Sequence, residues 1–407
     1  MKHSLSCPNL KNLELIKQTE NLLSIKIRNK LTSKIIVPIY KKRQILSIFL
    51  YLLIPWIFLS LNLLCLRYLS IYYLSAYIIL ATYSFWRQDN INPHSLNTYI
   101  RNLIIWKWFK DYFPISLKQT AILDKNRNYI FGYHPHGILP FGAIINFGTN
   151  ANKFDNLYPG IKPHLVTLRT QFFIPFYNIY LSFFGITDAS KKSINKILKN
   201  GPGSSCVIIL GGAKESLNAY PESTKLTLKN RKGFVKLALL NGASLVPVYS
   251  FGQNDSYNQI IYNSDSLLRI IQTNFQKKLG FSIPFFYGTG IFLKYGLLPK
   301  RKPINTVIGK PIHCPKIEIQ NLRQIIIDYY HNLYINELKK IFDINSFKIN
   351  MAYFDFHRKI ERSFSNKFIK IFGDPYLELN SKENFNKYFN FSTLVKSPSC
   401  SIFKNDE

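Results

Sequence analysis

The architecture of this chain can be inferred from a stretch that reads Tyr129-Ile130-Phe131-Gly132-Tyr133-His134-Pro135-His136-Gly137. Its first five residues are aromatic or β-branched around one glycine, a composition typical of a buried strand. Two histidines and a glycine follow within four residues. In α/β sheets, ligands bind outside the carboxyl ends of the strands. The stretch therefore predicts an α/β domain whose functional site lies just after residue 133.

Further strands are predicted where apolar, β-branched runs alternate with helical patterns, at residues 165–168, 206–210, 244–251 and 305–308. Apolar runs of this kind are typical of strands buried on both faces, so the expected fold class is α/β, a mostly parallel sheet flanked by helices. One helix is predicted over 231–240, with Asn230 as its N-cap and Gly242 just past its end.

The N-terminal part predicts a membrane hairpin over residues 45–86, preceded by a basic leader at residues 1–44. Residues 45–66 form a run of 22 residues without a charge. A helix of that length, at about 1.5 Å per residue, spans a bilayer core of about 30 Å. A second uncharged run of 19 residues covers 68–86. Two alternatives stay open: a re-entrant loop, favoured by Pro55 and Asn62, and a pair of buried core helices.

The charge balance predicts an anionic partner and a cytosolic orientation. The chain carries 53 Lys+Arg against 22 Asp+Glu, a net charge of +31, which suits a membrane surface or a phosphorylated small molecule. Basic residues flank the outer ends of the hairpin, at 41–43 before it and at Arg87 and Arg101 after it. The positive-inside rule then places both termini and the catalytic domain in the cytosol. No nucleic-acid recognition motif is present, so a nucleic-acid partner is not expected.

The cysteines are scattered along the chain, at Cys7, Cys65, Cys206, Cys314 and Cys400. This pattern predicts neither a disulfide framework nor a Cys-rich zinc site, and it favours a reducing compartment. Cys206 and Cys314 are therefore expected to be free thiols.

His134 and His136 are the leading catalytic candidates. An imidazole with a pKa of about 6.5 can remove a proton from an alcohol at neutral pH, and few other side chains can. Two other interpretations stay open on the residues alone. The histidines can be satisfied by backbone carbonyls, or they can belong to a metal site that needs a third ligand, such as His164, brought in by folding. A metal is not expected, because no third ligand stands at a recognisable spacing.

Two further motifs are candidates for binding substrate. Gly211 and Gly212 follow a predicted strand and let backbone N–H groups approach a ligand or an oxyanion. Glu215, three residues on, supplies a carboxylate that can orient a histidine. Arg231 and Lys232 stand at a predicted helix start, which suits a phosphate. Taken singly, the Gly-Gly motif fits an ordinary tight turn with a solvated Glu better than a binding site. The Arg231-Lys232 motif fits a solvated basic turn equally well.

Together the segments resemble the diacylglycerol acyltransferase type 2 family, which also contains monoacylglycerol and wax-alcohol acyltransferases. The matching blocks keep one order along the chain: Asp111-Tyr112-Phe113-Pro114, Asn128 to Gly137, Pro159-Gly160-Ile161, Gly211-Gly212-Ala213-Lys214-Glu215, Arg231 to Lys236, Leu245 to Asp255, and Pro303-Ile304 with Gly309-Lys310-Pro311-Ile312. A hairpin upstream of these blocks also fits the family.

The resemblance implies an integral membrane enzyme of the endoplasmic reticulum and lipid droplets, with a glycerolipid acyltransferase-like fold. It implies transfer of a fatty acyl group from acyl-CoA to diacylglycerol, with no cofactor or metal. The histidine would deprotonate the hydroxyl, with His134 favoured as base and His136 in a positioning role. Gly137, Asn254 and Asp255 lie in matching blocks and are expected to bind substrate. A monoacylglycerol or alcohol acceptor, a non-catalytic lipid-binding role and an oligomeric state stay open.

The chain departs from the family pattern at some positions. Related glycerolipid acyltransferases pair the catalytic histidine with an Asp five positions on, but Leu139 and Phe141 stand there, so Glu215 is the expected substitute. Charged residues expected by the resemblance are also missing from Tyr177-Asn178-Ile179, from Gln253 and from Gly288-Thr289-Gly290. Lost charges there are expected to alter the choice of acceptor.

The expected acyltransferase domain covers residues 87–349, and residues 350–407 form a C-terminal extension. In this extension Phe or Ile recurs at every fourth residue from Phe356 to Phe372, among lysines and arginines. The spacing predicts a basic amphipathic helix, which suits packing on the domain and a membrane interface equally well.

Overall fold

The structure is a computed structural model that describes residues 41–68, 70–90, 96–262, 265–290 and 295–346. Most of the predicted leader at 1–44 lies outside these residues. The amphipathic helix predicted between Phe356 and Phe372 lies wholly outside them.

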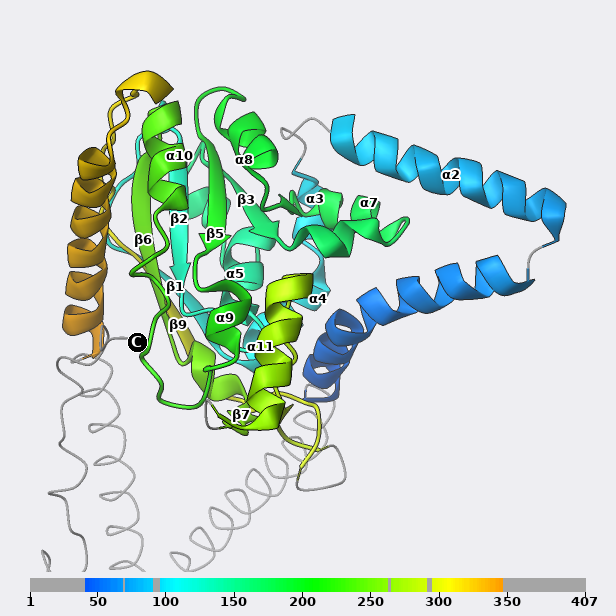
Figure 1. Cartoon of the computed structure of the whole chain (residues 1–407). Coiled ribbons are helices and arrows are strands. Elements are labelled where there is room, and N and C mark those ends of the chain that lie inside the picture. Colours follow the sequence, from blue (N-terminus) through cyan, green and yellow to red (C-terminus); the bar gives the residue numbers. More distant parts are fainter. Residues whose placement is uncertain (1–40, 69, 91–95, 263–264, 291–294, 347–407) are drawn as a thin grey trace, which may run out of the picture.

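A seven-stranded sheet forms the centre of the molecule, in the order β1-β9-β6-β2-β5-β3-β4 (Figure 1). Its strands are β1 (Ile115–Gln119), β2 (Tyr129–His134), β3 (Lys162–Thr167), β4 (Thr187–Asp188), β5 (Ser204–Ile209), β6 (Ser244–Phe251) and β9 (Ile304–Ile308). Neighbouring strands pair in parallel except β6 and β9. A small separate sheet pairs β7 (Asn258–Gln259) with β8 (Phe286–Tyr287). The predicted mostly parallel α/β sheet is confirmed.

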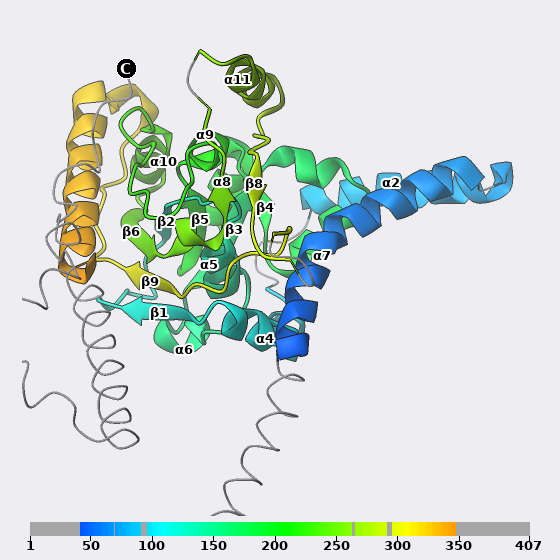
Figure 2. The same ribbon diagram turned by 90° about the horizontal axis from the view of Figure 1, so that it is seen from below.

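Helices pack on both faces of this sheet and enclose two hydrophobic cores (Figure 2). The first core receives α4 (Ile104–Tyr112), α5 (Phe141–Ala143), the π-helical turn η1 (Ile144–Gly148), α6 (Phe154–Leu157) and α7 (Tyr177–Phe183). The second core receives α8 (Lys191–Leu198), α10 (Gly233–Asn241) and the helix at residues 324–346. The remaining elements are α3 (Thr98–Arg101), η2 (Arg169–Phe173), α9 (Gly212–Ser216), η3 (Gln253–Ser256), α11 (Leu267–Leu279) and η4 (Ile319–Asn321).

Strand β2 sends alternate side chains to the two cores, because successive residues of a strand point to opposite faces. Tyr129, Phe131 and Tyr133 are buried in the first core, whereas Ile130 is buried in the second. By the same alternation, the last residue of the strand, His134, lies on the side of the second core.

All five strands predicted from the sequence are present, but the two edge strands were not predicted. The edge strand β1 alternates buried with exposed residues and contains Lys118 and Gln119, and β4 is only two residues long. Neither has the continuous apolar run that marks a strand buried on both faces.

The helix predicted at 231–240 is α10, which begins two residues later. Lys232 occupies the N-cap position and makes no side-chain capping bond, so the prediction of Asn230 as cap is wrong. The predicted end is confirmed: Gly242 takes the left-handed conformation with φ +66, which glycine adopts without strain.

The N-terminal region forms two long helices, at 41–68 and α2 (Ile71–Asn90), which run out from the body and back to it (Figure 1). By length and composition, one helix among the described residues, Lys41–Tyr68, is long and apolar enough to cross a membrane. The predicted pair of helices is therefore present, and one of them is a candidate membrane span, whereas the choice between a full crossing and a re-entrant hairpin stays a prediction. Only 11% of that span is buried inside the chain, which argues against a core helix.

The first half of helix 41–68 nevertheless packs onto the domain. Ile48 is fully buried, and the ring of Tyr51 contacts Phe109 and Phe141 edge to face. Farther along, Asn62 donates to the Pro175 carbonyl at 3.3 Å. The apolar side chains of the outer half are largely exposed, among them Leu61, Leu63, Leu64 and Leu66.

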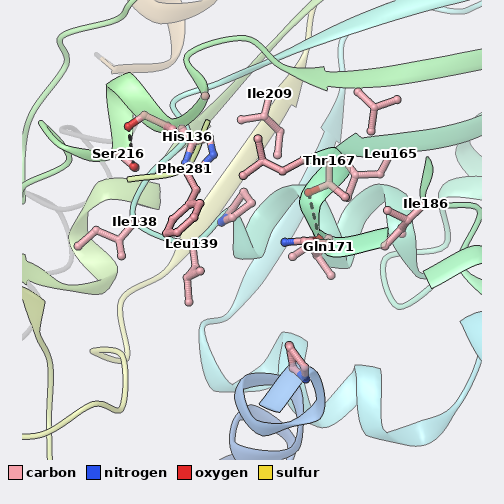
Figure 3. A pocket seen from close by; sticks show the side chains of 18 of the residues that line it. His136, Ile138, Leu139, Leu165, Thr167, Gln171, Ile186, Ile209, Ser216 and Phe281 are labelled. Atoms are coloured by element: carbon pink, nitrogen blue, oxygen red, sulfur yellow. Dashed lines mark hydrogen bonds between the residues drawn. The ribbon is translucent and has the colours of Figure 1, made fainter. Parts of the chain in front are cut away.

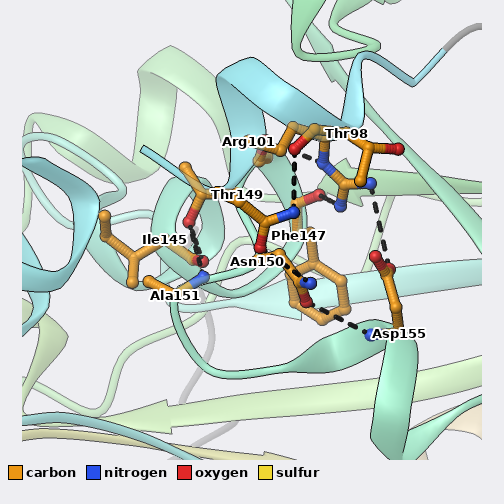
Figure 4. A network of polar contacts seen from close by, with 10 residues as sticks. Thr98, Arg101, Ile145, Phe147, Thr149, Asn150, Ala151 and Asp155 are labelled. Carbon is orange, nitrogen blue, oxygen red and sulfur yellow. Dashed lines mark hydrogen bonds and ion pairs between the residues drawn. The ribbon is translucent and has the colours of Figure 1, made fainter. Parts of the chain in front are cut away.

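One of the basic residues assigned to the flank of the hairpin is a structural residue instead (Figure 4). Arg101 is buried, and its guanidinium donates to the carbonyl oxygens of Phe147 at 3.1 Å and Gly148 at 3.2 Å. These carbonyls end the η1 turn, where a cation is favourable. A carboxylate oxygen of Asp155 lies 3.9 Å from the guanidinium. Arg101 therefore cannot serve as a free charge at a membrane surface.

Candidate active site

The predicted site lies in a tight loop after β2, at the carboxyl edge of the sheet. The His134–Pro135 peptide bond is cis, and Gly137 has φ +69, a conformation that glycine adopts without strain. A side chain at position 137 would collide with Gln253, whose amide nitrogen lies 2.9 Å from the place of a Cβ. The loop consequently needs glycine at this position.

His136 faces a large cavity (Figure 3). Its Nδ1–H donates to the Gly137 carbonyl at 2.8 Å. This bond leaves the proton on Nδ1, so Nε2 carries the free lone pair, and Nε2 has no hydrogen-bond partner among the described residues. Burial lowers the pKa of His136, and the Gly137 carbonyl partly opposes that shift. The ring is therefore neutral at pH 7 and can accept a proton at Nε2.

His134 points the other way, into the second core. Its ring is fully buried, and its Nε2 bonds to the Tyr334 hydroxyl at 3.0 Å. That hydroxyl in turn donates to the Gly132 carbonyl at 3.0 Å, so it accepts the proton of His134. Burial lowers the pKa of His134 to about 3. Since His134 does not line the cavity, the preference for it as the base, with His136 in the positioning role, is not supported by the geometry.

Glu215 lies next to the histidine loop but bonds to its backbone. One carboxylate oxygen accepts the His136 backbone N–H at 2.6 Å, and the other accepts the Thr227 N–H at 2.9 Å. Burial raises the pKa of Glu215, while the two N–H donors and the charge of Arg231 oppose the shift. The predicted pairing of Glu215 with an imidazole is thus replaced by a clamp that joins two loops through their amides.

Gln253 holds the other side of the same loop and is fully buried. Its side-chain oxygen accepts from the Tyr133 hydroxyl at 3.1 Å and from the Gly142 N–H at 3.0 Å. Its amide nitrogen donates to the Leu139 carbonyl at 2.8 Å. An ionised Glu could not make this last bond, because a carboxylate only accepts. The uncharged amide at position 253 therefore holds the loop through bonds that a carboxylate could not all make.

The cavity has a volume of about 1520 Å³, larger than the range of about 300–1,000 Å³ that is common for small-molecule sites. Its lining is largely apolar and comes from several elements. It includes Phe49 and residues 51–56 of helix 41–68, Leu165, Val166 and Leu168, Tyr177, Tyr180 and Leu181 of α7, and Phe281, Pro284, Phe286, Leu297 and Leu298. His136 lies among the apolar Ile138, Leu139 and Phe281 in Figure 3. Such a space suits long acyl chains.

Three basic residues also line the cavity. Lys191 stands at the start of α8, and Arg231 and Lys232 precede α10, which packs against α8. Lys232 forms an ion pair with Asp328 at 2.7 Å, across to the helix at 324–346. The cavity therefore combines an apolar interior with a cationic part of its wall.

The residues predicted to bind substrate fall into two groups. Gly212, Arg231 and Lys232 line the cavity. Four others do not and support the surrounding loops instead: Gly137, Gly211, Asn254 and Asp255. A side chain at Gly211 would overlap the Glu215 carboxyl group, Asn254 donates to the Ser223 carbonyl at 2.7 Å, and Asp255 accepts the Glu222 N–H at 2.8 Å.

Two features of the site could not be predicted from local sequence patterns. Tyr334, the partner of His134, lies two hundred positions away on the helix at 324–346, and no local motif surrounds it. The cavity wall from helix 41–68 was also missed, because an uncharged run indicates a membrane span and not which of its faces packs on protein. In the part of the chain that the structure describes, no three His, Cys, Asp or Glu residues gather as a metal site would require. Cys206 and Cys314 are free, as predicted.

Comparison with known proteins shows clear relatives. A family model described as diacylglycerol acyltransferase matches residues 63–354. Diacylglycerol O-acyltransferase 2 of Dictyostelium discoideum is 51% identical over 245 residues, 60% of this chain and 74% of that protein. The protein of the same name from Homo sapiens is 42% identical over 321 residues, 76% of this chain and 81% of that protein. A solved 1-acyl-sn-glycerophosphate acyltransferase of Thermotoga maritima covers 74% of this chain and 97% of its own, with TM-score 0.32 and 9% identity, too distant to support a conclusion.

Proposed function

The chain belongs to the diacylglycerol acyltransferase family and is an acyltransferase, and on that premise we propose that it transfers a fatty acyl group from acyl-CoA to the free hydroxyl of diacylglycerol. The products are triacylglycerol and CoA. The observation that carries this proposal is the placement of His136, a neutral imidazole with a free Nε2 lone pair, in the wall of a large apolar cavity.

His136 acts as the general base in the proposed reaction. Its Nε2 takes the hydroxyl proton of diacylglycerol while the oxygen attacks the thioester carbonyl. The new C–O bond forms, the C–S bond breaks, and the proton passes from Nε2 to the departing CoA sulfur. A general base of this kind contributes about 10²- to 10⁴-fold in rate. The largely apolar cavity wall disfavours water beside the thioester and so limits its hydrolysis.

The remaining cavity residues divide the two substrates between them. Lys191, Arg231 and Lys232 supply positive charge for the CoA phosphates. The apolar wall from helix 41–68 holds acyl chains. The backbone N–H groups at the turn of Gly212 are the candidates to stabilise the oxyanion of the tetrahedral intermediate. No cofactor or metal is needed for this chemistry.

Glu215 and Gln253 position the base and do not react. The Glu215 carboxylate holds the His136 backbone amide, and Gln253 holds the residues that follow the loop at Leu139 and Gly142. Together they fix the imidazole relative to the cavity, which matters because small displacements of a base cost large factors in rate.

We also propose that the enzyme resides in the endoplasmic reticulum membrane and on lipid droplets, with its catalytic domain facing the cytosol, where acyl-CoA is available. Helix 41–68 supports membrane residence. Protease added to sealed microsomes should digest tags at both ends of the chain, and protection of either tag would contradict this orientation.

Purified full-length protein tests the activity directly. With radiolabelled oleoyl-CoA and diacylglycerol in mixed micelles, the label should appear in triacylglycerol, and the His136→Ala protein should give none above background. Parallel reactions with monoacylglycerol and with a long-chain alcohol test the other acceptors. A higher kcat/KM for either of these than for diacylglycerol would reassign the acceptor, and label only in free fatty acid would refute acyl transfer.

A further inference from the structure

Helix α11 exposes its apolar side and turns its polar side toward the protein, which is unusual for a surface helix in contact with water alone. Its apolar residues Leu267, Leu268, Ile270, Ile271 and Phe275, here called the α11 patch, are all exposed. A surface helix normally buries its apolar side and exposes its polar side. Helix α8 of the same domain does so: Ile194, Ile197 and Leu198 are buried while its lysines are exposed.

The polar side of α11 holds the helix on the protein. Arg269 donates to the Leu217 carbonyl at 3.1 Å and to the Asn218 side-chain oxygen at 2.6 Å. Gln272 is buried and donates to the Ile283 carbonyl at 2.8 Å. These bonds fix the rotation of the helix, so the α11 patch cannot turn inward. In Figure 2, α11 stands out from the body, away from the central sheet.

The apolar surface next to α11 is continuous with the substrate cavity. The segment that follows α11 contributes Phe281, Pro284 and Phe286 to the cavity wall. Tyr295 and Leu297 belong to both places: they line the cavity, and they are 58% and 72% exposed. An apolar layer covering this surface would therefore reach the cavity itself.

We propose that the α11 patch is a second membrane contact of this enzyme, in addition to helix 41–68, and that the lipid acceptor enters the cavity beside Tyr295 and Leu297. A bilayer surface is the occupant that fits. It supplies an apolar layer, helix 41–68 lines the same cavity, and residues 260–297 carry four basic residues against one acidic residue, a bias that suits an anionic lipid surface. The membrane contact stands on its own, whereas the entry route rests on the proposed function.

Photo-cross-linking tests the contact without any measurement of activity. A photoreactive phenylalanine analogue replaces Ile271 in the full-length protein, which is reconstituted in vesicles of radiolabelled phosphatidylcholine and phosphatidylserine. The matched control carries the analogue at Ile325, which is exposed on the helix at 324–346 and does not line the cavity. Lipid label is expected at position 271 and not at 325. Absence of lipid label at 271, or a cross-link there to a second copy or another part of this chain, would overturn the proposal.

A charge variant tests the entry route. L268E, I271E and F275E are combined in one protein, and I122E, I319E and I325E form the control, since all six residues are exposed and none lines the cavity. For diacylglycerol presented in vesicles, we expect the apparent KM of the α11 variant to rise about tenfold or more, with kcat on detergent-dispersed acceptor unchanged. The control should match the parent protein. An unchanged KM would exclude entry at α11, and equal losses with both acceptor forms would point to damaged folding instead.

Discussion

The end of strand β2 has a closed side and an open side, and each holds one histidine. On the closed side His134 is fully buried against Tyr334 and Gly132, with its Nε2 already occupied. On the open side His136 uses only Nδ1 in a hydrogen bond and presents Nε2 to the cavity. Two identical side chains, separated by one cis proline, thus have different chemistry because they face different neighbours.

The difference shows that burial alone does not make a catalytic histidine. The pKa of each histidine is lowered by burial, and that of His134 lies far lower, at about 3. A base also needs a free lone pair and a path to the substrate. Only His136 has both, because the unpaired Nδ1 of His134 is buried and His134 does not line the cavity. Each change below should therefore affect the two sides unequally.

The largest effect is expected at His136. His136→Gln should lower kcat by about 10²- to 10⁴-fold, because the amide cannot accept the hydroxyl proton. His134→Gln should lower kcat far less, since an amide can still donate to Tyr334. The measurement is kcat of both purified proteins with saturating acyl-CoA. Equal losses, or a greater loss at His134, would remove the distinction between the two sides.

Glu215→Gln should show how far the open side depends on the loop clamp. A Gln offers one oxygen to the two N–H donors of His136 and Thr227, and a buried donor left without a partner costs about 1–3 kcal/mol. We expect kcat to fall about tenfold or more while KM for acyl-CoA stays near the parent value. Glu318→Gln, at an exposed carboxylate, is the control and should change neither. A parent-like kcat for Glu215→Gln would mean that the clamp does not position the base.

Gly132→Ala probes the packing of the closed side. A Cβ there would lie 2.0 Å from the Tyr334 hydroxyl and 2.8 Å from a Leu210 methyl carbon. Overpacking of this kind destabilises a core by about 1–3 kcal/mol. The control is Gly233→Ala, where a Cβ meets no atom within 4 Å. Thermal unfolding in detergent should show a lower Tm for Gly132→Ala alone, and equal Tm values would mean that the closed side is loosely packed.

The smallest effect is a pH dependence of stability from His134. Its folded pKa of about 3 lies below the unfolded value, which is about 6.5. Between these values the unfolded chain binds a proton that the folded chain does not, so stability is complete above pH 6.5 and falls with pH below it, by at most about 1.4 kcal/mol per pH unit. His134→Gln should flatten the fall in Tm between pH 6.5 and 5. An unchanged slope would contradict the burial of His134.

The fold could largely be predicted from the sequence because its central strands are buried on both faces. Runs such as 129–133 and 244–251 leave little alternative to a parallel sheet, whereas edge strands such as β1 carry no such pattern. The prediction of Asn230 as N-cap is wrong because tertiary contacts, and not the local sequence, decide where a helix begins. The helix begins after Lys232, and Asn230 lines the cavity.

The location of the site in the sequence could be predicted, but the contacts between its side chains could not. The strand-end rule located the loop with His134 and His136, and the alternation of β2 already assigns His134 to the face of Ile130. What no local pattern contains is the distant partner that fills that face, Tyr334, or the fact that Glu215 reaches a backbone amide and not a ring. Such contacts depend on how segments far apart in the chain are brought together.

Chemical rescue with free imidazole tests the assignment of the base most directly. Replacing His136 with Ala leaves space that opens to the cavity, so added imidazole can enter and take over the proton transfer. The account predicts that turnover of His136→Ala rises with imidazole concentration, following its unprotonated form, while His134→Ala, sealed against Tyr334, does not respond. Rescue of His134→Ala without rescue of His136→Ala would contradict the account.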